Sequence, residues 1–199
     1  YEQAARRGAD WLVKQLQPDG CFLRPDFQAD GYYKAPTAFL LTGHLCQAYR
    51  LMDWVKAHDL KRDGELRHFN LTFSIYKSSW LTHAAHRLGR FDVSVPAMKN
   101  ILRWQAPCGG FYERHARTPH VEGVCTSWAG HAMIYLGRLD AARRAGNCLI
   151  RLIRRQPDKK KLYCSLTSQG KLIVGESKVP EPIVLDTAKL GQRYYYPGL

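Results

Sequence analysis

Long apolar runs are missing from this sequence, and the longest stretches cover only a few residues, as from Ala38 to Leu41. A membrane-spanning helix needs about 20 consecutive apolar residues, so we expect no transmembrane segment. The opening residues also lack the charged, apolar and small-residue order of a leader peptide. Because 45% of the 199 residues are hydrophobic, the chain can bury one sizeable core, and we predict a single domain over residues 1–199.

No Cys-x-x-Cys pair is present, although the chain has six cysteines: Cys21, Cys46, Cys108, Cys125, Cys148 and Cys164. Several of them lie among apolar neighbours, as small core residues do. We therefore predict reduced thiols and a cytoplasmic location rather than a disulfide framework. Because the first residue is Tyr1 and not methionine, we also expect the numbering to begin within a longer gene product.

Acidic residues are scarce, with 17 Asp and Glu against 30 Lys and Arg, which gives a formal net charge of +13. The densest basic run extends from Arg143 to Lys161. Such a run can attract phosphates or an anionic membrane surface, and a solvated helix face followed by a basic turn explains it equally simply. No finger, basic zipper or RNP-like sequence accompanies the charge, so we do not expect a nucleic-acid partner.

One pattern occurs three times along the chain. An apolar helix ends at a glycine, and a basic or imidazole residue, an apolar residue and a second amphipathic helix follow. The glycines are Gly43, Gly89 and Gly137, which lie 46 and 48 residues apart. Glycine suits this corner because it can close a helix in the left-handed conformation. We predict three helical-hairpin repeats, roughly at residues 8–58, 68–114 and 120–158.

A second element recurs between the hairpins. It reads Asp19-Gly20-Cys21-Phe22 and again Cys108-Gly109-Gly110-Phe111, each time just after a helix. We predict a glycine turn that returns one aromatic side chain to the core. From residue 159 to 190 the pattern loosens into a loop, and the β-branched residues, glycines and prolines of residues 162–184 predict a short irregular or β-hairpin insertion.

This order of elements resembles the repeats of the terpenoid cyclase and protein prenyltransferase superfamily. The resemblance rests on Trp11 and Gln15 or Trp104-Gln105, on the glycine turn with its Phe, and on the helix end Leu136-Gly137-Arg138-Leu139, and it covers most of residues 8–155. It implies an all-α fold in which helical hairpins form part of an α/α toroid around a cavity. A closed toroid of six hairpins needs on the order of 300 residues, so we expect an incomplete one.

The superfamily's acid and magnesium motifs have no counterpart here. Neither Asp-x-Asp-Asp nor an aspartate-rich motif is present, and Cys125 with His131 or His120 is a poor substitute for the zinc site of prenyltransferase β-subunits. The sequence therefore predicts no metal and no cofactor.

Alignment of the copies on their glycines places two sets of residues at equivalent positions: Lys34, Trp80 and Trp128, and Thr37, His83 and His131. Two copies thus carry Trp-x-x-His, whose side chains share one helix face. A pair of imidazoles beside a cavity suits a general acid and base, because histidine titrates near neutral pH. Hydrogen-bonded core histidines and packed core tryptophans are the alternatives.

Further candidates come from the helix mouths of the expected toroid. We expect Tyr32, Tyr33 and Lys34 to precede the first inner helix, and Tyr194 and Tyr195 to lie in a matching context before a further helix. The predicted substrate-binding residues are Tyr32, Tyr33, Lys34, Tyr76, Trp80, Trp128, Tyr194 and Tyr195. Asp186 and Glu113 are the carboxylates nearest these mouths, and Asp186 joins His83 and His131 as an acid–base candidate, although lone loop carboxylates are usually solvated or capping.

These features predict an enzyme that folds a hydrophobic, terpenoid-like or polycyclic small molecule in a toroid cavity and promotes its cyclisation or isomerisation. A carbohydrate-active toroid, such as an epimerase or lyase, uses the same residue types, because aromatic rings stack on sugars. A non-catalytic helical repeat that binds a protein partner through its basic stripe is a third interpretation.

Overall fold

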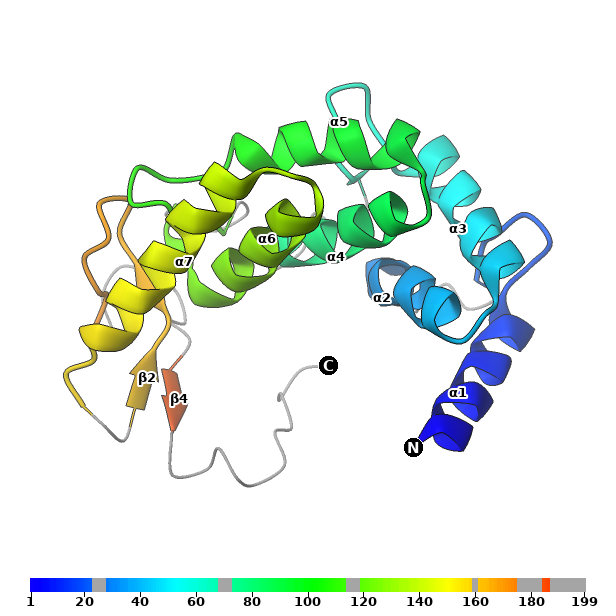
Figure 1. Cartoon of the computed structure of the whole chain (residues 1–199), viewed down its shortest axis with the longest axis horizontal. Helices are drawn as coiled ribbons and strands as arrows, with labels where there is room; N and C mark the ends of the chain where they lie inside the picture. Colours follow the sequence, from blue (N-terminus) through cyan, green and yellow to red (C-terminus); the bar gives the residue numbers. More distant parts are fainter. Residues whose placement is uncertain (23–27, 68–72, 114–118, 159–160, 175–183, 187–199) are drawn as a thin grey trace.

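The computed structural model describes residues 1–22, 28–67, 73–113, 119–158, 161–174 and 184–186 (Figure 1). These residues are mostly helical, as the sequence predicts. The described part contains the helices α1 (Glu2–Gln15), α2 (Gln28–Leu41), α3 (Leu45–His58), α4 (Ser74–Arg87), α5 (Phe91–Leu102), α6 (Gly123–Tyr135) and α7 (Leu139–Arg154). None of them combines the length and the apolar character that a membrane span requires.

The helices form a curved double layer. α2, α4 and α6 lie side by side on the inside of the arc, and α3, α5 and α7 pack behind them on the outside (Figure 1). The outer helices are amphipathic, as in α7, where Ala141, Ala145, Cys148 and Leu152 are buried at helical spacing. The inner helices are buried on more sides, and α4 has ten buried residues. Two core clusters therefore follow the arc between its layers.

Each hairpin turns at the predicted glycine. Gly43, Gly89 and Gly137 have φ angles of 82°, 71° and 68°, which lie in the left-handed region. This confirms the prediction that these glycines close the inner helices, because other residues rarely adopt such angles.

The glycine turn with its returning apolar residue occurs four times in the described residues rather than twice. Gly20, Gly64, Gly109 and Gly170 have φ angles of 91°, 85°, 90° and 85°. In each turn the glycine N–H donates to the carbonyl three residues earlier, over 2.8–3.0 Å. An isolated bridge then joins the residues on either side of the turn, as between Leu60 and Leu66. The first three turns follow α1, α3 and α5, and the last follows the strands beyond α7.

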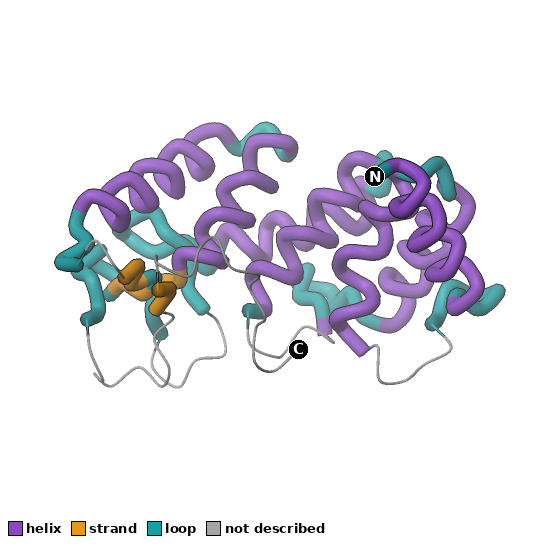
Figure 2. Tube along the Cα trace, turned by 90° about the horizontal axis from the view of Figure 1, so that it is seen from below, coloured by secondary structure: helices purple, strands orange, loops and turns teal. Residues whose placement is uncertain are grey.

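Short antiparallel strands extend the far end of the arc. β1 (Val121–Glu122) pairs with β3 (Ser165–Leu166), and β2 (Lys161–Tyr163) pairs with β4 (Val184–Asp186). Figure 2 shows these strands at the end of the molecule opposite α1. The sequence predicts an irregular or β-hairpin insertion near residues 162–184, and the described residues there form short strands that pair antiparallel.

The start of α2 differs from the sequence expectation. Tyr32, Tyr33 and Lys34 lie inside α2 rather than before it, because the helix begins at Gln28 and continues through Pro36. A proline near an apolar segment usually marks a first helical turn. Here the helix tolerates Pro36 in its interior, so the three residues occupy helical positions.

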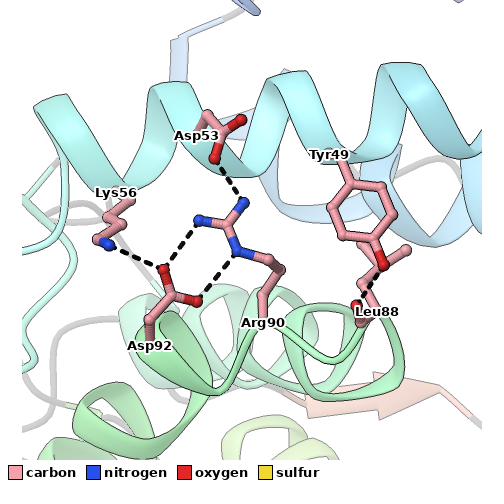
Figure 3. Close-up of polar contacts among 6 residues, drawn as sticks. All are labelled: Tyr49, Asp53, Lys56, Leu88, Arg90 and Asp92. Atoms are coloured by element: carbon pink, nitrogen blue, oxygen red, sulfur yellow. Dashed lines mark hydrogen bonds and ion pairs between the residues drawn. The ribbon is translucent and has the colours of Figure 1, made fainter.

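A cluster of ion pairs joins the first two hairpins (Figure 3). Arg90, at the corner between α4 and α5, donates to both carboxylate oxygens of Asp92 over 3.0 and 2.9 Å and to Asp53 of α3 over 2.6 Å. Lys56 of α3 also contacts Asp92, at 2.9 Å. Hydrogen bonding from Arg90, followed by that from Lys56, holds the pKa of Asp92 well below its usual range.

Arg90→Met is expected to reduce the free energy of unfolding by about 1–2 kcal/mol. The substitution removes the bidentate hydrogen bonds of the guanidinium, and only 14% of the Arg90 side chain is exposed. Urea denaturation measures this loss. Arg6→Met is the matched control, since the pair between Arg6 and Glu2 is 68% and 80% exposed and is expected to contribute about 0.3 kcal/mol. Equal losses for the two variants would contradict a structural role for the Arg90 cluster.

Two arginines of α7 and the arginine that follows its last residue contact the neighbouring turns. Arg144 donates to the Gln105 side chain, Arg151 donates to the Cys108 carbonyl, and Arg155 donates to the Gly170 carbonyl over 3.1 Å. These three arginines of the basic run therefore stabilise the packing of the turns on α7.

Candidate functional site

Equivalent positions of the three inner helices lie next to one another on the inside of the arc. Trp80 and Trp128 stack with their ring centroids 3.7 Å apart, and the Nζ atom of Lys34 lies 6.0 Å from the Trp80 ring. One turn further along, His83 and His131 lie with their ring centroids 5.2 Å apart. The alignment of the repeats on their glycines therefore selects residues that are neighbours in space.

Tyrosine rings and the Lys34 ammonium lie close to the tryptophan pair. Tyr76 contacts Trp80 and Trp128 edge-on, at centroid distances of 6.5 and 5.9 Å. The Lys34 ammonium lies 5.2 Å from the Tyr33 ring and 5.9 Å from the Tyr76 ring. Burial lowers the pKa of Lys34, but hydrogen bonding to Tyr33 and the proximity of Tyr76 outweigh it, so that this pKa is raised overall. Lys34 therefore carries a positive charge at neutral pH.

The two imidazoles have unsatisfied ring nitrogens. Among the described residues, neither nitrogen of His83 has a hydrogen-bond partner, and the same holds for Nδ1 of His131 and Nε1 of Trp80. The His83 residue is only 4% exposed. A buried polar atom without a partner costs about 1–3 kcal/mol, so these atoms are unusual in a folded core.

The protonation state of His83 differs from the sequence expectation of a group that titrates near neutral pH. Burial, followed by the proximity of His131, Arg87 and His86, lowers the pKa of His83 to about 4. This side chain is therefore neutral at pH 7, where it can accept a proton or a hydrogen bond but is not a proton source.

A shallow depression opens beside the imidazoles. It has a volume of about 230 Å³ and is lined by Ser127, Trp128 and His131. Ligand pockets usually have about 300–1,000 Å³, so this depression is smaller than a typical ligand pocket.

Tyr135 is a site residue that the sequence prediction missed. Its ring lies 4.4 Å from the His83 ring and 5.1 Å from the His131 ring, and 49% of the residue is exposed. The sequence does contain a signal for it, because Tyr135 follows His131 by four residues on α6 and therefore shares its helix face.

Tyr32 lies apart from this site. Its hydroxyl accepts a hydrogen bond from the Phe22 amide over 3.1 Å, and its ring stacks on Trp54 at 4.5 Å. Burial, followed by a hydrogen bond with Cys21, raises the pKa of Tyr32 to about 12. These contacts join the first turn, α2 and α3, so Tyr32 has a structural environment instead of the predicted position at a pocket rim.

The remaining candidates have three different outcomes. Asp186 ends β4, where its backbone pairs with Lys161; the structure does not describe its side chain. Tyr194 and Tyr195 lie outside the described residues. Glu113 is buried and accepts a hydrogen bond from the Cys125 thiol over 3.3 Å, and that thiol also contacts the backbone of Tyr76.

The described residues contain no group of three His, Cys, Asp or Glu side chains that could hold a metal ion. The tripeptide Asp19-Gly20-Cys21 has the Asp-x-Cys form found in prenyltransferase zinc sites. Its Asp19 carboxylate, however, accepts a hydrogen bond from the Cys21 amide, and the Cys21 thiol contacts the Phe22 carbonyl and the Tyr32 hydroxyl. The tripeptide therefore forms the first glycine turn.

Comparisons with protein-family models, with curated proteins and with solved structures found no match to this chain.

Proposed function

We propose that the arc is part of an α/α toroid of the terpenoid cyclase and prenyltransferase type, whose inner face binds a small hydrophobic molecule and promotes its cyclisation or isomerisation. The observation that carries this proposal is the pair of imidazoles, His83 and His131, with unsatisfied ring nitrogens beside stacked tryptophans. A ligand with an apolar body and a polar group would pack on Trp128 and, after a side-chain rearrangement that uncovers the buried nitrogens, would hydrogen-bond to them.

The open shape of the site supports the toroid. Inner and outer helices alternate through three hairpins, and the depression is smaller than a usual ligand pocket. Further hairpins opposite the arc would close this space.

Proton transfer is the chemistry that these side chains favour. Neutral His83 would accept a proton or orient a substrate oxygen, and His131, which lines the depression, would exchange the proton with the substrate. The charged Lys34 near the rings of Tyr76 and Trp80 disfavours a cationic intermediate beside them and favours a ligand with a negatively polarised group. We therefore favour isomerisation by proton transfer over a cyclisation that depends on ring-stabilised carbocations.

A carbohydrate ligand is the second candidate. The depression is open, and it combines the Ser127 hydroxyl with the Trp128 ring and the His131 imidazole. An aromatic face with adjacent hydrogen-bonding groups suits a sugar ring.

A thermal-shift panel of isoprenoid alcohols, isoprenoid acids, polycyclic hydrocarbons and monosaccharides tests the proposal. Since a ligand at 100 times its Kd stabilises by about 2.7 kcal/mol, we expect an isoprenoid acid to raise the Tm of the wild-type chain by several degrees. His131→Ala is expected to weaken its binding at least tenfold. His58→Ala is the control, because His58 is exposed on α3.

If the isoprenoid acid bound the wild-type chain and the His131→Ala variant equally, the proposed role of the imidazoles in ligand binding would be wrong. A shift with monosaccharides alone would favour the carbohydrate alternative.

A further inference from the structure

Two cysteines that are 40 residues apart in the sequence lie in contact. The Sγ atoms of Cys108 and Cys148 are 3.9 Å apart. Cys108 is partly exposed in the third glycine turn, and Cys148 is buried in α7. A disulfide has an S–S length of about 2.05 Å, so the sulfurs must approach by about 1.9 Å to form a bond.

The backbone architecture holds this contact in place. Cys108 directly precedes the turn glycine Gly109, as Asp63 precedes Gly64, and Cys148 lies eleven residues after its corner glycine, as does Asn100. In the preceding repeat these equivalent positions also touch, since Asn100 donates to the Asp63 carbonyl over 3.4 Å. The turn of each repeat is therefore held against the next outer helix, whatever side chains occupy the two positions.

The surroundings fix the third turn especially closely. A Cβ atom at Gly109 would lie 2.5 Å from the Arg144 carbonyl oxygen, so the turn and α7 are in close backbone contact. Arg151 of α7 donates to the Cys108 carbonyl. The fourth turn packs on Cys108, because a Cβ atom at Gly170 would lie 3.1 Å from the Cβ atom of Cys108.

We propose that Cys108 and Cys148 form a redox-responsive thiol pair, which a small oxidised thiol such as glutathione disulfide converts into a disulfide between the third turn and α7. The more accessible Cys108 thiolate attacks one sulfur of the glutathione disulfide, and one glutathione thiolate leaves. The Cys148 thiolate then attacks Cys108 Sγ, and the second glutathione leaves. Two protein thiols are oxidised and one disulfide is reduced, so atoms and electrons balance.

The second step is the slow one at neutral pH. Burial, followed by the proximity of Cys108, raises the pKa of Cys148 to about 12. Because only the thiolate attacks, the mixed disulfide on Cys108 is expected to accumulate at pH 7, and ring closure is expected to become roughly tenfold faster for each pH unit up to pH 9.

Incubation of the wild-type chain with glutathione disulfide, followed by intact-mass measurement and peptide mapping, tests the proposal. We expect a product that has lost two hydrogen atoms, with a cross-linked peptide that joins Cys108 to Cys148. The oxidised chain is expected to unfold at a Tm higher by roughly 5–10 °C, and dithiothreitol is expected to reverse the shift.

Cys108→Ser and Cys148→Ser are expected to abolish the cross-link, and Cys46→Ser, which removes an exposed thiol, is the control that leaves it intact. If either serine variant fails to fold, peptide mapping of the wild-type and Cys46→Ser chains still decides the question. The proposal is overturned if oxidation at pH 9 gives only glutathione adducts, or only cross-links through Cys21 or Cys46.

Discussion

Gly64→Ala is expected to destabilise the fold by about 3–5 kcal/mol. A Cβ atom at this position would lie 2.0 Å from the Pro96 carbonyl oxygen and 2.4 Å from its carbon, so the backbone of α5 would have to move. The φ angle of 85° adds strain for any L side chain. Urea denaturation, followed by circular dichroism, measures the loss.

Gly89→Ala is the matched control for this substitution. Gly89 has a similar φ angle of 71°, but no heavy atom lies within 4 Å of a Cβ built there. The control therefore carries the conformational strain without the steric conflict, and a loss of about 1 kcal/mol is expected. Losses of equal size at Gly64 and Gly89 would mean that close packing of the turn on α5 does not stabilise the fold.

The contrast between these glycines also explains what the sequence could predict. The corner glycines 43, 89 and 137 are recognisable because apolar helices flank them in the same order each time. The second and fourth turns escaped prediction because they have Leu66 and Leu172 where the other two have phenylalanine. Their shared requirement is a backbone one, namely a left-handed glycine that forms a turn after a helix or strand. A search for aromatic residues does not detect that requirement.

The candidate site shows a similar division. Alignment of the repeats paired Trp80 with Trp128 and His83 with His131. These pairs are in contact in the structure, because equivalent positions on neighbouring inner helices are also neighbours in space. The alignment did not indicate that the Tyr32 ring stacks on Trp54, because it placed this residue before the helix and α2 begins earlier, at Gln28. The sequence could not predict the low pKa of His83 either. That pKa depends on burial and on charges from elsewhere in the fold, which only the packed structure defines.

The free energy of unfolding is expected to fall by about 2 kcal/mol between pH 7 and pH 5 because of His83. Its pKa is about 4 in the folded chain, against a usual value of 6.5. Between these values the unfolded chain binds a proton at this position and the folded chain does not. Lowering the pH therefore favours unfolding, and the contribution that is complete above pH 6.5 is lost as the pH falls toward 4.

His83→Leu removes this titration and is expected to flatten the pH dependence by the same amount, as urea denaturation at pH 5, 6 and 7 measures. His58→Leu is the control, because His58 is exposed and is expected to leave the slope nearly unchanged. The same experiment also bears on the proposed chemistry. A neutral His83 at pH 7 is what a proton acceptor beside His131 requires. A slope in His83→Leu equal to that of the wild-type chain would mean that folding does not lower the pKa of His83, and it would contradict the desolvated state assigned to this imidazole.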